Sequence, residues 1–279
     1  YPMLFLYRKR AADSGGPGRW RGGVGADTAI TPYGADRMTV RLTTSGTDHS
    51  HTTGLWGGYP GGGSTARVAK GALPTQIASA AARLPADWSE VAGTIEYLPS
   101  KVVFELEAGD ILSAVPHGGG GYGDPIARDA ESVRQDVIES CVSEQAAAAV
   151  YGVVLTGSSK EIDVTRTAQR RAAIRSGRGS NGSALPSQST GIGAIKDDVG
   201  WQCAACHHVF GDGAKSLKAA MVARRRRVGD AATPVAQRTG GDSRSMELVE
   251  YACPRCGTLA AIDQRPKGEK QLWDDMKPD

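Results

Sequence analysis

The stretch HGGGGYGDPIARDAESVRQDVIESCVSEQAAAAV, residues 117–150, marks the point at which a glycine-rich sequence gives way to a helical one. Asp129 is a favourable helix N-cap, and the apolar residues that follow it from Val133 recur at the spacing of one helical turn. Ser143 precedes a second helical run, and a third helix is expected over residues 163–175. This part of the chain is therefore predicted to be mainly helical.

The sequence before this point is unusually rich in glycine. Residues 1–125 hold 22 of the 37 glycines, which gather into clusters at 14–25, 54–63 and 117–124. Glycine permits positive φ and close backbone approach, but it weakens helices and strand interiors. Short apolar or alternating runs between and after the clusters are typical of β-strands. These runs cover residues 3–7, 38–42, 100–112 with a turn at 108–110, and 151–155.

Four of the five cysteines form two Cys-x-x-Cys pairs, Cys203/Cys206 and Cys253/Cys256. A two-residue spacer lets a tight turn direct two thiolates at one ion, and two such turns complete the tetrahedral shell that Zn²⁺ prefers. A closed shell of four thiolates leaves no position for water or substrate, so the expected ion is structural. Two disulfides are the alternative, but they require an oxidising compartment and fit poorly with a fifth cysteine.

Composition also divides the chain into regions. Residues 176–199 are rich in Ser and Gly and lack periodicity, which is typical of a flexible linker. We therefore expect a body over residues 1–175, the linker over 176–199 and a small tail over 200–279. The predicted fold class is α+β, with a β-rich glycine-loop body, a few helices at the end of that body, and a zinc-ribbon-like tail domain.

The distribution of charged and apolar residues argues against a membrane partner. The formal charge of +3 lies after residue 200, where Lys and Arg outnumber Asp and Glu by 13 to 10. No apolar run is long enough to span a bilayer, and the first ten residues end, rather than begin, with positive charges, unlike a signal peptide. We expect a cytoplasmic protein that binds no membrane.

A basic run, ARRRR at residues 223–227, leaves a nucleic-acid-binding tail as an alternative. Such a run can hold phosphates. The tail has a low net charge, however, and few aromatic residues between the basic ones for stacking on bases. We expect the run to lie on a solvent-exposed helix over 217–227 and expect no nucleic acid partner. A further alternative is that the whole chain is a pure assembly module, in which zinc holds a docking tail and other subunits perform all of the catalysis.

The glycine run beside the helices has two possible roles. Gly118, Gly119, Gly120 and Gly121 offer successive N–H groups that could form a nest for phosphate, carboxylate or an enolate oxygen. Alternatively, the glycines only let the chain turn where a strand meets a helix. His117 precedes the run and is the candidate acid–base residue, although a lone histidine is more often a structural polar side chain.

Three blocks of this sequence resemble the hydantoinase B/oxoprolinase family. They are residues 13–25, 54–58 and 118–155, and they occur in the family's order across residues 1–175. Three blocks in order are more specific than one glycine motif. The tail resembles the zinc-binding small subunit of acetone-carboxylase-type enzymes. Together, body and tail most resemble a subunit of a ketone carboxylase of the acetophenone carboxylase type.

The resemblance implies a subunit of a multi-subunit, ATP-dependent, biotin-independent ketone carboxylase, a ligase that forms C–C bonds and is not active as this chain alone. ATP and Mg²⁺ would be bound by a hydantoinase-A-like partner subunit, and ketone and bicarbonate would be the substrates of the complex. A full-length family member carries a long stretch before the segment matched here, so we expect another polypeptide to supply this missing N-terminal part.

A hydantoinase- or oxoprolinase-type amidohydrolase subunit is the alternative within the same family. The aromatic residues Trp56, Tyr59 and Tyr122 lie in the resembling blocks and would suit a substrate pocket. They do not distinguish a ketone from a hydantoin or from oxoproline.

Overall fold

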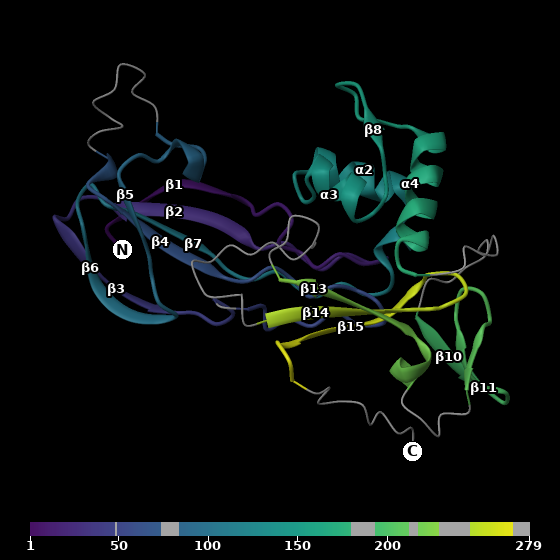
Figure 1. Cartoon of the computed structure of the whole chain (residues 1–279). Coiled ribbons are helices and arrows are strands. Elements are labelled where there is room, and N and C mark those ends of the chain that lie inside the picture. Colours follow the sequence, from purple (N-terminus) through teal and green to yellow (C-terminus); the bar gives the residue numbers. More distant parts are fainter. Residues whose placement is uncertain (48, 74–83, 180–192, 212–216, 229–245, 270–279) are drawn as a thin grey trace.

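The computed structural model of the chain consists mainly of small antiparallel sheets, with its α-helices gathered in one region (Figure 1). This arrangement is of the expected α+β, β-rich type. No helix in the part that the structure describes combines the length and apolar character needed to cross a membrane. The described residues are 1–47, 49–73, 84–179, 193–211, 217–228 and 246–269.

The body is built on a five-stranded antiparallel sheet with the order β1-β2-β7-β4-β5. A separate two-stranded ribbon pairs β3 with β6 over its whole length. The sheet strands are β1 (Met3–Arg10), β2 (Ala26–Pro32), β7 (Ile111–Val115), β4 (Thr65–Lys70) and β5 (Thr94–Tyr97), and the ribbon strands are β3 (Arg37–Thr43) and β6 (Lys101–Glu107).

Alternation along these strands places apolar side chains on both faces of the sheet. On one face, Ala69 and Ile111 pack with Trp88 of the 3₁₀ helix η1 (Trp88–Glu90). On the other face, Val68 and Leu112 pack against Leu106 of the ribbon. The strands expected at 3–7, 38–42 and 100–112 are confirmed, with the turn at Gly109, whose φ is 94°.

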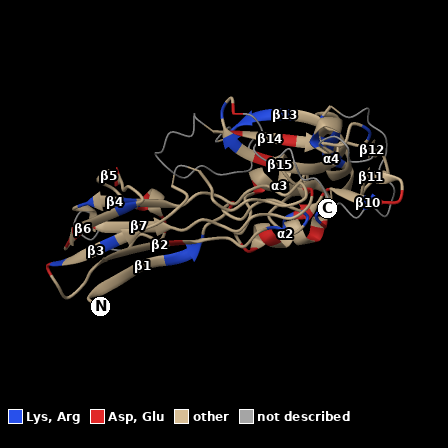
Figure 2. Cartoon of the chain, turned by 90° about the horizontal axis from the view of Figure 1, so that it is seen from below, with Lys and Arg blue, Asp and Glu red and all other residues tan. Residues whose placement is uncertain are grey.

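Three glycine-rich segments, residues 14–25, 54–63 and 117–123, lie side by side between the sheet and the helices, and we call them the glycine bundle (Figure 2). Backbone hydrogen bonds join every pair of segments: Gly16 N donates to Gly119 O at 2.8 Å, Gly121 N to Tyr59 O at 2.9 Å, and Tyr59 N to Pro17 O at 2.8 Å. A Cβ on Gly58 would lie 2.1 Å from Gly121 O. The segments therefore approach more closely than any side chain would permit.

The helical region that follows has its own core. Its elements are η2 (Pro125–Ala127), α2 (Ala130–Ile138), α3 (Glu144–Ala149), α4 (Val164–Ser176) and a short hairpin of β8 (Leu155–Thr156) and β9 (Glu161–Ile162). As expected, Asp129 caps α2, and Ser143 and Asp163 cap α3 and α4; each side chain accepts a backbone N–H of the first turn. The packed residues are Val133, Val142, Ala147, Tyr151 and Val153.

The expected strand at 151–155 is wrong over most of its length. Gly152 has a φ of 65°, which turns the chain, and only Leu155 belongs to a strand. Tyr151 and Val153 are instead buried in the helical core. Their apolar character therefore reflects packing on helices rather than strand pairing.

The tail contains two three-stranded antiparallel sheets with the orders β10-β11-β12 and β13-β14-β15. The elements are β10 (Ala194–Asp197), β11 (Gly200–Cys203), β12 (Val209–Gly211), the 3₁₀ helix η3 (Leu217–Ala220), β13 (Val222–Arg227), β14 (Met246–Ala252) and β15 (Leu259–Pro266). The helix expected over 217–227 is confined to the 3₁₀ helix η3, and the expectation is wrong for the basic run, which forms β13. There Arg226 Nε lies 2.9 Å from a carboxylate oxygen of Glu250 on β14.

The tail packs directly on the glycine bundle. Tyr59 shares a core cluster with Val228, Leu248 and Leu259 of the tail. A Cβ on Gly57 would lie 2.3 Å from Leu259 O, so the two backbones are also in close contact. Within the stretch expected to be a linker, β10 pairs with β11 and Arg178 is buried, while residues 180–192 lie outside the described part.

Candidate functional site

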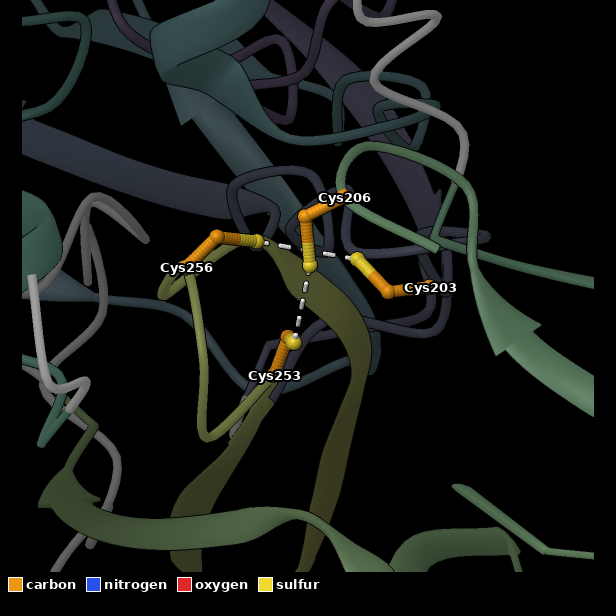
Figure 3. A group of neighbouring side chains, drawn as sticks. All are labelled: Cys203, Cys206, Cys253 and Cys256. Atoms are coloured by element: carbon orange, nitrogen blue, oxygen red, sulfur yellow. Dashed lines mark hydrogen bonds between the residues drawn. The ribbon is translucent and has the colours of Figure 1, made fainter. Parts of the chain in front are cut away.

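The four paired cysteines come together in the tail with their sulfurs directed at one another (Figure 3). All four Sγ atoms lie within 4.8 Å of one another. Cys203 Sγ is 3.6 Å from Cys256 Sγ, and Cys206 Sγ is 3.7 Å from Cys253 Sγ. All four are buried and none is in a disulfide. The cluster therefore presents four thiols to one point, as a tetrahedral metal site requires.

Two turns of the same construction hold the cysteines. Cys203 ends β11 and Cys253 directly follows β14. In each turn the carbonyl of the first cysteine accepts the N–H of the residue four positions later, His207 or Gly257, at 2.9 Å. Both of these residues have positive φ, 56° and 72°. We call the turns the first and the second knuckle. His207 therefore has a backbone role here, which explains its left-handed conformation.

The cluster does not hold four thiolates without a cation. Hydrogen bonding to Cys253 and Cys256, followed by burial, raises the pKa of the Cys203 thiol. The pKa of Cys256 is lowered, because its sulfur accepts hydrogen bonds from Cys203 and Cys253. Protons thus accumulate on some sulfurs and leave others, as expected when like charges are crowded together. A divalent cation would replace these protons and allow all four sulfurs to ionise.

The glycine run next to the helices does not form a nest of free N–H groups. Gly118 N donates to Gly62 O at 3.3 Å, Gly119 N to Gly23 O at 2.9 Å, and Gly121 N to Tyr59 O at 2.9 Å. A Cβ on Gly120 would lie 1.9 Å from Thr53 O. Three of the four N–H groups are therefore used within the glycine bundle, which favours the structural role of the run over the anion-binding one.

His117 lies at the edge of the bundle, and its side chain is exposed. Its backbone N–H donates to Ser64 Oγ at 3.0 Å, and its Nδ1 lies 3.3 Å from the same oxygen. Ser64 is buried, so it holds the histidine backbone and ring against β4. The imidazole is thus positioned by the fold but remains accessible.

Two buried polar contacts between distant segments were missed by sequence reasoning. Tyr59 Oη donates to Glu250 Oε1 at 2.6 Å, and burial and the Glu250 charge raise the pKa of Tyr59, so the hydroxyl keeps its proton. Arg178 Nη1 donates to Asp124 Oδ2 at 2.7 Å, with both side chains at most 5 % exposed. The only signal for the second pair is the Asp-Pro that ends the glycine run.

The aromatic residues considered for a pocket do not gather in one place. Tyr59 is buried against the tail, whereas the ring of Tyr122 contacts Trp20, with centroids 5.5 Å apart. Trp56 lies against the backbone of Gly193, where a Cβ would be 3.2 Å from the indole ring. These residues therefore join segments of the fold rather than line a common cavity.

Two known families match separate parts of the chain. Residues 1–125 match the family described as hydantoinase B/oxoprolinase. Residues 191–279 match the family described as acetone carboxylase gamma subunit. Residues 1–125 are therefore similar to hydantoinase B/oxoprolinase, and residues 191–279 to the acetone carboxylase gamma subunit.

Individual relatives include subunits of two carboxylases. The chain is 28 % identical over 193 residues to the acetone carboxylase alpha subunit of Xanthobacter autotrophicus, covering 63 % of this chain and 25 % of the relative. It is 25 % identical over 196 residues to the acetophenone carboxylase delta subunit of Aromatoleum aromaticum, covering 65 % and 28 %. The nucleotide-free structure of acetone carboxylase matches with a TM-score of 0.54 and 27 % identity, covering 66 % of this chain and 26 % of that one. The chain thus spans about a quarter of the length of these relatives.

Proposed function

We propose that this chain is one subunit of a multi-subunit, ATP-dependent ketone carboxylase of the acetone or acetophenone carboxylase type, which works without biotin. The chain contributes the C-terminal part of a hydantoinase-B-like carboxylation subunit and a structural metal site. Ketone and bicarbonate are the substrates of the complex, which joins them through a new C–C bond.

One observation carries this proposal. A body that matches hydantoinase B and a tail that matches the acetone carboxylase gamma subunit occur in one chain and share a hydrophobic cluster around Tyr59. The body alone would be equally consistent with an amidohydrolase of the hydantoinase or oxoprolinase type. The tail supports a carboxylase, because the family that it matches is described by that activity.

We also propose that the tail is zinc-ribbon-like and that Cys203, Cys206, Cys253 and Cys256 bind one Zn²⁺. Four thiolates at about 2.3 Å from a tetrahedral zinc place their sulfurs about 3.8 Å apart. The separations of 3.6 and 3.7 Å fit this geometry. A bound ion would cross-link the two knuckles and stabilise the tail. With four protein ligands it would offer no position to a substrate.

His117 is the residue of this chain that we propose for proton transfer, at a site shared with a partner subunit. Its exposed imidazole is held by the contact with Ser64 and can reach a group outside this chain. Imidazole is the commonest general acid or base in enzymes. ATP and Mg²⁺ belong, in this proposal, to a hydantoinase-A-like partner, since this sequence carries no P-loop motif.

Reconstitution tests this proposal. The purified chain, the polypeptides that co-purify with it and their mixture are each assayed for ketone-dependent ATP hydrolysis and for incorporation of labelled bicarbonate. We expect activity only in the mixture, and we expect His117→Gln to lower the turnover rate while Cys141→Ser, a change in the helical region, does not. Ketone-dependent ATP hydrolysis by the chain alone would refute the division of labour. Hydrolysis of a hydantoin or oxoproline without bicarbonate uptake would identify an amidohydrolase instead.

A further inference from the structure

Asp124 lies where the glycine bundle meets the helical region, and its carboxylate is 1 % exposed. Each of its oxygens accepts two hydrogen bonds. Oδ1 accepts the N–H of Ile126 at 3.1 Å and Nη2 of Arg178 at 3.1 Å. Oδ2 accepts Nη1 of Arg178 at 2.7 Å and the N–H of Leu259 at 2.9 Å. A buried carboxylate with four donors is held in a single position.

Arg178 completes the connection to the tail. It follows α4, and its Nη1 also donates to the carbonyl of Gly257 at 3.0 Å. Gly257 is the residue that closes the second knuckle, because its N–H donates to Cys253 O. Leu259, which donates to Asp124, begins β15 two residues later. Arg178 therefore contacts the main chain of the knuckle that carries two of the cysteines, and Asp124 contacts the first residue of the strand that follows it.

The same carboxylate is tied to all three segments of the glycine bundle. Asp124 directly follows Tyr122 and Gly123. Tyr122 N donates to Trp20 O and Gly123 N donates to Leu55 O, both at 2.9 Å. Trp20 and Leu55 belong to the other two segments of the bundle. Hydrogen bonds thus connect the second knuckle to the ion pair, and the peptide backbone from Asp124 to Gly123 and Tyr122 continues the connection to the other segments of the bundle.

A buried ion pair stabilises a fold only while both partners and their remaining hydrogen bonds stay in place. If the second knuckle opened, Asp124 would lose the Leu259 N–H and Arg178 would lose the Gly257 carbonyl. The bundle would lose its anchor in the same event. Because metal binding by thiolates is coupled to folding, occupation of the four cysteines is what keeps such a knuckle closed.

We propose that Asp124 and Arg178 are positioning residues that transmit metal binding at the four cysteines to the glycine bundle, so that the bundle is held in register only in the metal-loaded chain. This inference rests on the proposed metal site. It makes the tail a condition for an ordered body rather than an appendage to it.

Hydrogen exchange on the full-length chain tests the inference. Peptides from the glycine bundle and from the β3–β6 ribbon are followed in zinc-loaded chain and in chain stripped by a chelator. In the wild type, we expect metal removal to accelerate exchange in the bundle at least tenfold while the ribbon is unchanged. In zinc-loaded Asp124→Asn, bundle exchange should match that of the stripped wild type, although the zinc content stays at one per chain.

Asp110→Asn is the matched control. Asp110 is also a buried carboxylate of the body, with bonds to Lys70 and to the N–H of Gly71, but these contacts lie within the body itself. This variant should keep the metal-dependent difference in the bundle. Arg178→Lys, which retains the charge but cannot make the forked contact, serves as a second variant if Asp124→Asn does not fold.

Three results would overturn the inference. If the chain binds zinc but hydrogen exchange in the glycine bundle is the same before and after the zinc is removed, the coupling is refuted and the metal site still stands. Loss of the metal-dependent difference in Asp110→Asn would mean that any destabilisation has this effect. A chain that binds no zinc would refute both the proposed metal site and the coupling.

Discussion

Replacing Gly22 with alanine should destabilise the chain far more than replacing its neighbour Gly23. A Cβ on Gly22 would lie 2.1 Å from Gly119 O, where contacts under 3.0 Å are essentially never seen, so the two segments must separate by about 0.9 Å. Separation would strain the bond from Gly119 N to Gly23 O, now 2.9 Å. Overpacking costs about 1–3 kcal/mol and a lost hydrogen bond about 1 kcal/mol, so we expect roughly 3 kcal/mol in total.

Gly23 provides the comparison because a Cβ there would meet nothing within 4 Å and its φ is not in the left-handed region. Gly23→Ala should be neutral or stabilise the chain by about 0.4–1 kcal/mol through the unfolded state. Thermal unfolding followed by circular dichroism measures both variants. The midpoint of Gly22→Ala should fall by roughly 6–12 °C. A fall no larger than that of Gly23→Ala would refute the close packing of the bundle.

Three further outcomes are expected. Cys253→Ser should abolish stoichiometric zinc binding, measured by elemental analysis, whereas Cys141→Ser should retain it, since Cys141 lies outside the cluster. Tyr59→Phe removes a hydrogen bond to a buried carboxylate and should cost about 1.5–3 kcal/mol in urea unfolding, while Tyr33→Phe, at an exposed ring, should change stability by less than about 0.5 kcal/mol. Burial raises the pKa of Asp110, but hydrogen bonds from an ammonium and two backbone N–H groups outweigh it and lower the pKa below 3.8. Its stabilising contribution is therefore complete above that pH and is lost as the pH falls further, so Asp110→Asn should flatten the acid limb of the stability curve; an unchanged limb would contradict this.

Local signals were sufficient for much of the fold. The three helix caps at Asp129, Ser143 and Asp163 were predictable because a cap depends on a side chain and an N–H only two or three residues away. The turns at the two Cys-x-x-Cys pairs were predictable for the same reason, because each depends on residues close together in sequence. The structure of the run at 217–227 could not be predicted from local sequence, because its arginines form a strand only in the presence of Glu250 and its neighbours on β14.

The remaining parts of the site depend on contacts between residues distant in sequence. Asp124 and Arg178 are 54 residues apart, and Leu259 is 135 residues from Asp124. Nothing in the composition around Asp124 indicates which cation neutralises it. The role of the glycine run was likewise undecided from sequence, since the acceptors of its N–H groups lie in two other segments. Glycine content alone could not tell a ligand nest from a packed bundle.

Because body and tail belong to one polypeptide, their contact does not weaken on dilution. Tethered partners meet at an effective concentration of order millimolar, whatever the concentration of the chain. An affinity between body and tail that is too weak to hold two separate proteins together at micromolar concentration would therefore still keep this tail docked. The covalent connection relaxes the demand on the interface, which can consist of a few buried polar contacts around Tyr59 and Asp124 and still be permanently formed.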